Sequence, residues 1–200
     1  MKSNVTSQDN SFRKVVLSVA FLNLAYFGVE FAVALAIGSV SLFADSVDFL
    51  EDASVNVLIF FAIAWSVRSR ARVGIALAII LLVPGLATLW TAFEKFLDPV
   101  APSPFALSLT GLGALVVNMV CAFMLAAYRH HSGSLSKAAF LSARNDAFAN
   151  LGIIAAGIVT AYLWRSAWPD LLVGLAIAAM NADAAREVWS AAQEEHRAQS

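Results

Sequence analysis

The chain has 200 residues, of which 60% are hydrophobic and only 14% charged. Because soluble globular domains have about 25% charged residues, this composition argues against a soluble protein. The 13 basic and 14 acidic side chains nearly cancel, so the overall charge gives no reason to expect a nucleic acid as a partner.

The apolar residues are gathered into long runs, and a helix needs about 20 such residues to cross a bilayer. Six runs of this kind lie at about 15–37, 40–67, 73–93, 105–128, 135–164 and 168–184. The sequence therefore predicts an all-α membrane protein, with six transmembrane helices in a single domain over residues 1–200. About 16 residues follow the last run, too few to bury a core, so we expect no soluble C-terminal domain.

The loops between the runs alternate in charge. Lysine and arginine gather before the first run, between the second and third, between the fourth and fifth, and after the sixth. By the positive-inside rule, this side faces the cytoplasm, so both termini are expected there. We expect a multi-pass integral protein of a bacterial inner (plasma) membrane.

The second run, 40–67, contains four carboxylates within eight residues, at Asp45, Asp48, Glu51 and Asp52. A charge at bilayer depth costs a few kcal/mol (about 2.5–3.5 on insertion scales) and usually serves a function. On a helix, Asp45, Asp48 and Asp52 share one face, whereas Glu51 lies about 60° from Asp48. This stripe of oxygen ligands indicates a path for cations.

A second polar face is predicted on the fifth run. Ser142, Asn145, Asp146 and Asn150 share one side of the helix, and Arg144 points nearly the opposite way. Carboxylate, amide and hydroxyl oxygens from two facing helices could enclose a divalent cation such as Mg²⁺, Ca²⁺, Mn²⁺ or Zn²⁺. The alternative for the asparagines is that they join helices by hydrogen bonds.

Acids outnumber bases within the runs. Arg144 is the one basic residue clearly at that depth, so the acids must be protonated, hydrated or bound to cations. The acids are Glu30, Asp45, Asp48, Glu51, Asp52, Asp146 and Asp183.

At these residues the chain resembles the cation diffusion facilitator family. The resemblance begins at Asn23 and Glu30, continues through 38–42 and 44–52, and resumes over 140–152. Such proteins export Zn²⁺, Cd²⁺, Mn²⁺, Fe²⁺ or Co²⁺ in exchange for protons, usually as homodimers. Because the chain lacks the family's cytoplasmic domain, its homodimer is expected to pack through the transmembrane helices.

The resemblance implies one pair of metal ligands on each of the second and fifth spans. Asp48 and Asp52 match the first pair, and Ser142 and Asp146 match the second. Ser142 departs from the family, which has His or Asp there. Asp45, Asn145 or a water would therefore complete the coordination shell, or the preferred ion is not zinc.

Several other residues have two interpretations. Glu30, Glu51 and Asp183 are candidates for proton transfer or for contacts between helices. His130 and His131 match the place of a histidine-rich loop in the family and could collect metal from the cytoplasm, although ordinary loop residues also fit.

The sequence thus predicts a divalent transition-metal exporter that works by metal/proton antiport. The metal is its substrate, and no permanently bound cofactor is expected. A membrane sensor or assembly subunit that binds metal without transport is the alternative, and a transporter of organic cations is a third reading. We expect no enzyme activity, because no nucleophile–base pair appears in the sequence.

Overall fold

The computed structural model describes residues 2–62, 86, 88–126 and 134–180, and these residues are helical apart from short turns and loops. The prediction of an all-α protein is thereby confirmed for the described part of the chain. The labelled helices are α1 (Lys2–Ile37), α2 (Val40–Ala62), α4 (Pro104–Ala126) and α5 (Ser134–Tyr162). Two shorter helical segments cover 88–97 and Trp168–Met180.

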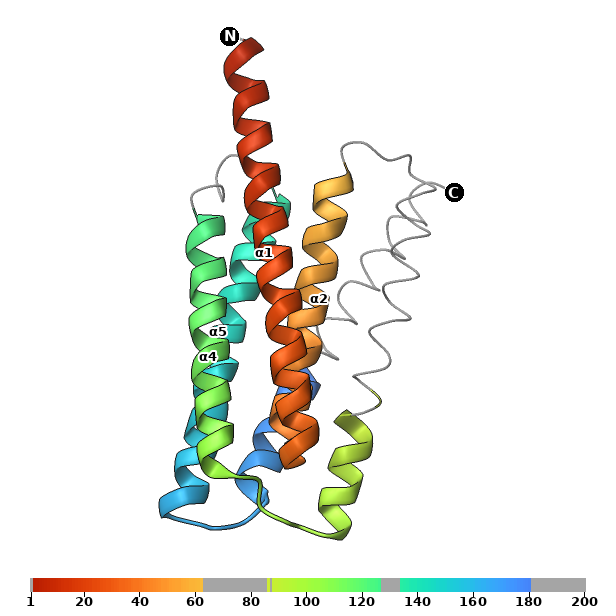
Figure 1. Ribbon diagram of the computed structural model, residues 1–200, viewed down its shortest axis with the longest axis vertical. Helices are drawn as coiled ribbons and strands as arrows, with labels where there is room; N and C mark the ends of the chain where they lie inside the picture. Colours follow the sequence, from red (N-terminus) through yellow and green to blue (C-terminus); the bar gives the residue numbers. More distant parts are fainter. Residues whose placement is uncertain (1, 63–85, 87, 127–133, 181–200) are drawn as a thin grey trace.

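The long helices lie side by side along the longest axis of the molecule (Figure 1). α4 packs most extensively on α5 and α1 on α2, and α2 also contacts α5. Three described connections, at 38–39, 98–103 and 163–167, lie at the same end of the bundle, opposite the start of α1 (Figure 1). We call this end the turn end. The described helices therefore run up and down along the bundle.

Two adjacent residues make the turn between α1 and α2. Gly38 has a φ of 60°, in the left-handed region that favours glycine, and the Ser39 amide donates to the Ala34 carbonyl at 3.1 Å. The Ser39 hydroxyl then accepts a hydrogen bond from the Leu42 amide at 3.2 Å. Gly38 thus ends α1 and Ser39 caps α2, so the first acid of α2, Asp45, lies six residues beyond a fixed point.

The helices differ in how well they meet the requirements of a membrane span. Among the described residues, the segments Ser11–Ile37 and Pro104–Ala126 are long and apolar enough to cross a membrane. α2 is also long, but it carries the four acids. The predicted span 73–93 lies mostly outside the described residues. Residues 2–14 extend α1 beyond its predicted run, because hydropathy marks the apolar part of a helix and not its end.

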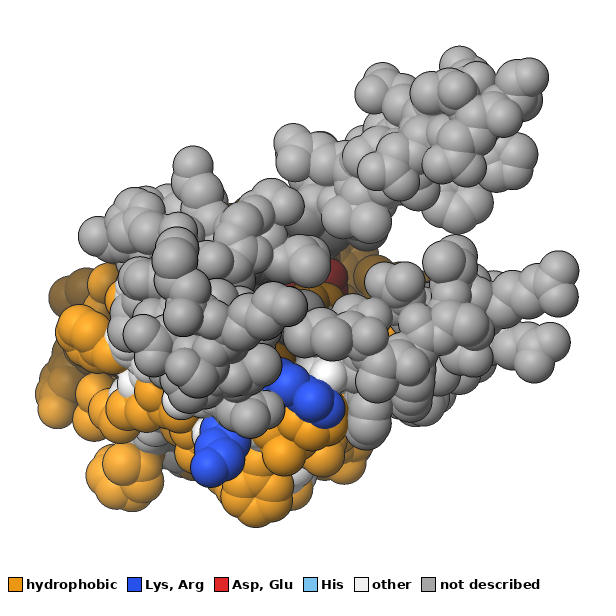
Figure 2. Space-filling model, turned by 90° about the horizontal axis from the view of Figure 1, so that it is seen from above, with side chains coloured by type: hydrophobic (Ala, Val, Ile, Leu, Met, Phe, Trp, Pro, Cys, Tyr) orange, Lys and Arg blue, Asp and Glu red, His pale blue; other side chains and the backbone are white. Residues whose placement is uncertain are grey.

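The described surface is rich in large apolar side chains. Figure 2 shows them from the end of the bundle that lies opposite the turn end. Phe21, Phe105 and Phe123 are each at least 70% exposed. Inside, a core cluster joins α1, α2, α4, α5 and the segment Trp168–Met180. It comprises Ala34, Leu42, Phe43, Ala44, Leu107, Ile153, Ala156 and Ile177. An apolar exterior around a packed interior suits a protein surrounded by lipid.

Candidate cation site

The acids of α2 differ in burial as their helical positions predict. Asp45 is fully buried, Asp48 and Asp52 are partly buried, and Glu51 is exposed. Asp45, Asp48 and Asp52 therefore point toward the inside of the bundle, and Glu51 points away from it. The Ser39 cap fixes the start of the helix six residues before Asp45, and helical geometry then sets the rotation of the later acids.

Asp146 of α5 lies opposite the acids of α2. The strongest electrostatic interaction of Asp48 is with Asp146, and that of Asp146 is with Asp52. Asp146 is partly buried. Asp48, Asp52 and Asp146, which the sequence predicts as metal ligands, therefore lie within electrostatic range of one another.

Glu30 adds a third helix to this group of acids. It is fully buried in α1, and its strongest charged neighbours are Asp45 and Asp48. No hydrogen bond of good geometry reaches the carboxyl oxygens of Glu30 or Asp45 from the described residues. Carboxyl groups from α1, α2 and α5 thus share one interior region, which we call the acid cluster. It comprises Glu30, Asp45, Asp48, Asp52 and Asp146.

Two asparagines repeat the same arrangement on α2 and α5. The Asn56 side-chain amide donates to the Asp52 carbonyl, and the Asn150 amide donates to the Asp146 carbonyl, each at 2.8 Å. Each asparagine keeps a buried Oδ1 that has no hydrogen-bond partner among the described residues. Both helices therefore present an unused amide oxygen one turn beyond an acid, and such oxygens are ligands for hard cations.

The acids are near one another but are not gathered into a coordination shell. Among the described side chains, no three His, Cys, Asp or Glu groups are close enough together to hold a metal ion. Ser142 and Asn145 belong to α5, but their side chains lie outside the described part. Asp183, His130 and His131 also lie outside the described residues.

The model of the cation efflux transmembrane domain matches residues 16–193 of the chain. The chain belongs to the cation efflux family. No curated protein matches it. Membership makes it a membrane protein of divalent cation transport, and it confirms the resemblance seen in the sequence. All residues of the acid cluster lie within the matched range.

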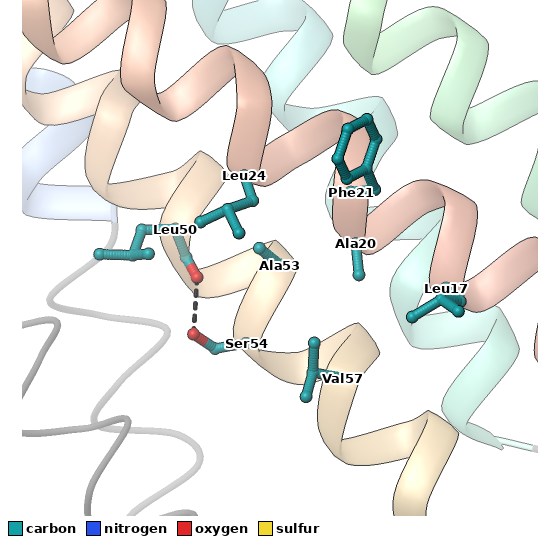
Figure 3. A pocket seen from close by; sticks show the side chains of 8 residues that line it. All are labelled: Leu17, Ala20, Phe21, Leu24, Leu50, Ala53, Ser54 and Val57. Carbon is teal, nitrogen blue, oxygen red and sulfur yellow. Dashed lines mark hydrogen bonds between the residues drawn. The ribbon is translucent and has the colours of Figure 1, made fainter.

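This cation efflux protein also has an apolar groove, which is distinct from the acid cluster. The groove has a volume of about 380 Å³ and lies between α1 and α2 (Figure 3). The Ser54 hydroxyl in it donates to the Leu50 carbonyl at 2.8 Å, so its one polar side chain is already engaged. Its lining offers no carboxylate. The lining residues are Leu17, Ala20, Phe21, Leu24, Leu50, Ala53, Ser54 and Val57.

Two polar contacts could not be predicted from the sequence. Asp170, near the start of the sixth apolar run, is fully buried and bonded to the start of α2. Cys121 of α4 lies within electrostatic range of Asp52 and Asp146, and its thiol donates to the Asn23 Oδ1 at 3.7 Å. The Ser39-x-Ser41 pattern indicates a helix cap, but nothing in the sequence names a partner about 130 residues away.

Proposed function

We propose that this protein exports a divalent transition-metal cation from the cytoplasm in exchange for protons. The observation that carries the proposal is the acid cluster itself. Carboxyl groups from three helices converge, and the main charged neighbours of Glu30, Asp48 and Asp146 among the described residues are other acids. A group of carboxyl side chains at bilayer depth is costly and usually serves a function.

The proposed substrate site consists of Asp48, Asp52 and Asp146, with Asp45, Ser142 and Asn145 as further ligands. Asp48 and Asp52 lie on α2, and Asp146 faces them from α5. Carboxylate and amide oxygens accept Mn²⁺, Fe²⁺, Co²⁺ and Zn²⁺, and the family also supplies Cd²⁺ as a candidate. Zn²⁺ is the reference ion of the proposal.

Proton exchange follows from the charges. When the site is empty, repulsion between neighbouring carboxylates favours keeping protons on some of them. A divalent cation stabilises the ionised groups, so its binding releases protons. If the site opens alternately to each side of the membrane, metal moves outward as protons move inward. In the proposed topology, six spans place both termini in the cytoplasm, and two copies pack through their transmembrane helices in a bacterial inner membrane.

The proposal is tested with purified protein in vesicles that contain a metal indicator and a pH indicator. Asp52→Ala and Asp146→Ala should each lower Zn²⁺ flux and the coupled proton flux by at least tenfold. Glu94→Gln is the matched control, because Glu94 is an exposed acid at the turn end and should leave both fluxes unchanged.

Two other outcomes overturn parts of the proposal. Unchanged coupled flux in both aspartate variants would show that the acid cluster is not the substrate site. Wild-type protein that binds Zn²⁺ with proton release but never moves it would favour the sensor or assembly subunit instead.

A further inference from the structure

Asp170 makes an unusually complete set of bonds at the start of α2. Its Oδ1 accepts from the Ser39 hydroxyl at 2.6 Å, the Ser41 hydroxyl at 2.6 Å and the Ser41 amide at 3.2 Å. Its Oδ2 accepts from the Val40 amide at 2.8 Å. The first amides of a helix lack partners within the helix, and a carboxylate there is also favoured by the helix dipole. The segment Trp168–Met180 therefore adds to the Ser39 cap of α2, although the two lie far apart in the sequence.

The same two helices touch again one turn further along. A Cβ atom at Gly174 would lie 2.7 Å from both the Ser41 nitrogen and the Val40 carbonyl carbon. Only a glycine allows the two backbones this close. One turn later, Ile177 joins the core cluster that contains Leu42. Hydrogen bonds, backbone contact and apolar packing thus follow one another where α2 meets the segment Trp168–Met180. We call this contact the joint.

Lys95 contributes a positive charge beside this joint. It is buried in the segment 88–97 and donates to the Val100 carbonyl. Its side chain also lies beside Gly38, since a Cβ there would be 3.6 Å from the Lys95 Cε. Asp170 and Asp98 are its charged neighbours. The charge of Asp170 is therefore balanced by the α2 dipole and by Lys95.

We propose that Asp170 is a positioning residue for transport, which joins α2 and the segment Trp168–Met180 into one rigid unit. The inference rests on the proposed function above. Asp45 follows Ser41 by one helical turn and Asp48 by about two, so an anchor at Ser41 sets the height and rotation of the acids on α2. Without the anchor, the start of α2 can shift, and the ligands on α2 and α5 no longer meet in register.

The first test separates ligand positioning from simple stability. Zn²⁺ flux is measured in vesicles and expressed per folded transporter, for Asp170→Ala, Asp170→Asn and the control Glu94→Gln. Asp170→Asn keeps the shape of the side chain but replaces one carboxylate oxygen with an NH₂ group. That group would face a hydrogen-bond donor in either orientation, either the Val40 amide or the donors that now bond to Oδ1. We expect KM for Zn²⁺ to rise about tenfold in Asp170→Ala and by an intermediate factor in Asp170→Asn. A fall in maximal flux with unchanged KM in both variants would overturn the proposal.

The second test needs no transport and so survives a failure of the proposed function. Amide hydrogen exchange is compared between wild type and Asp170→Asn across α2. If Asp170 positions the acids, exchange becomes faster from Val40 through the turn that contains Asp52. Faster exchange confined to residues 40–42 would mean that the anchor acts only locally, and the proposal would be wrong. If wild-type protein in vesicles shows no Zn²⁺ flux, the proposed function is wrong. The hydrogen-exchange comparison can still be interpreted in that case.

The third test asks whether the joint stays closed during transport. The Ser39 and Asp170 side chains meet at 2.6 Å, so cysteines are placed at both positions, and formation of a disulfide between them is verified by mass spectrometry before transport is measured. The chain has one cysteine, and Cys121→Ala removes it from the background. If the two helices form a rigid unit, the oxidised double-cysteine variant should have a KM for Zn²⁺ close to that of wild type, below the raised KM of Asp170→Ala. If oxidation instead stops transport and reduction restores it, the joint must open in each cycle and is a gate, which contradicts our proposal.

Discussion

Glu30 of α1 faces Asp45 of α2 inside the bundle, where both side chains are fully buried. No hydrogen bond of good geometry reaches either carboxyl group from the described residues. Burying two ionised carboxylates together without a counter-ion costs several kcal/mol, so a proton or a cation must accompany this pair. The pair therefore links the acids of α2 to α1.

We predict that Glu30→Gln lowers the number of protons released when Zn²⁺ binds. The amide keeps the shape of the side chain but carries no exchangeable acid proton, while the aspartates that would bind the metal remain. Zn²⁺ is titrated into purified protein in weak buffer, and proton release is followed with a pH indicator. Glu30→Asp keeps the carboxyl group and should retain most of the release. Equal release in Glu30→Gln and wild type would remove Glu30 from the proton path.

The sequence predicted the local arrangement of the acids well, because helical phase alone decides it. Asp45 and Glu51 are six residues apart on one helix, yet one is fully buried and the other exposed. The Gly38–Ser39 turn was likewise visible as a break between apolar runs. These features depend on neighbours within two turns, which the order of residues contains.

The contacts between helices could not be predicted in the same way. Asp170 bonds to Ser39 and Ser41 across 129 to 131 positions, and Tyr26 bonds to α4 across 84. Periodicity shows which face of a helix is polar, but it does not tell which other helix that face meets. The partners depend on how the helices pack, and packing requires the three-dimensional structure.

A tyrosine and a glycine form a specific contact between α1 and α4. The Tyr26 hydroxyl donates to the Thr110 carbonyl at 2.6 Å, and a Cβ at Gly113 would lie 2.2 Å from that hydroxyl oxygen. We predict that Tyr26→Phe lowers the free energy of unfolding by about 1 kcal/mol. Gly113→Ala should cost about 1–3 kcal/mol, because the new methyl group displaces the ring.

The double variant tests whether the two residues act through one contact. In the Tyr26→Phe background, the closest atom to the new methyl group is gone, so Gly113→Ala should cost less than it does alone. Denaturant unfolding in detergent measures the four free energies of the cycle. Additive costs would show that the clash lies elsewhere.

Gly174 and Gly28 provide a matched comparison for the close approach of helices. A Cβ at Gly174 would lie 2.7 Å from backbone atoms of α2, whereas a Cβ at Gly28 would have no atom within 4 Å. We predict that Gly174→Ala lowers the free energy of unfolding by about 1–3 kcal/mol, because the backbone of α2 has to move. Gly28→Ala should be neutral or stabilise the protein by up to about 1 kcal/mol, since alanine favours helix. Similar effects at both positions would contradict the packing at the turn end.

The ammonium group of Lys95 predicts how stability depends on pH. Burial lowers the pKa of Lys95 from its ordinary value of 10.5, although Asp170 and Asp98 act in the opposite direction. Between the lowered pKa and 10.5, the unfolded chain binds more protons than the folded protein. The contribution of Lys95 to the free energy of unfolding therefore increases as pH rises through that window. Below the window, this contribution does not change with pH.

Lys95→Arg isolates this effect, because arginine keeps its charge at every pH in the window. We predict that the apparent unfolding midpoint of wild type, relative to Lys95→Arg, rises as pH increases toward about 10.5. Thermal unfolding in detergent, scanned from neutral pH to about pH 11, measures the difference. Lys95→Met never carries the charge. The pH dependence of the wild-type unfolding midpoint should therefore approach that of Lys95→Met at the alkaline end of the scan. A difference between wild type and Lys95→Arg that stays flat or falls with pH would mean that folding does not disfavour the Lys95 charge.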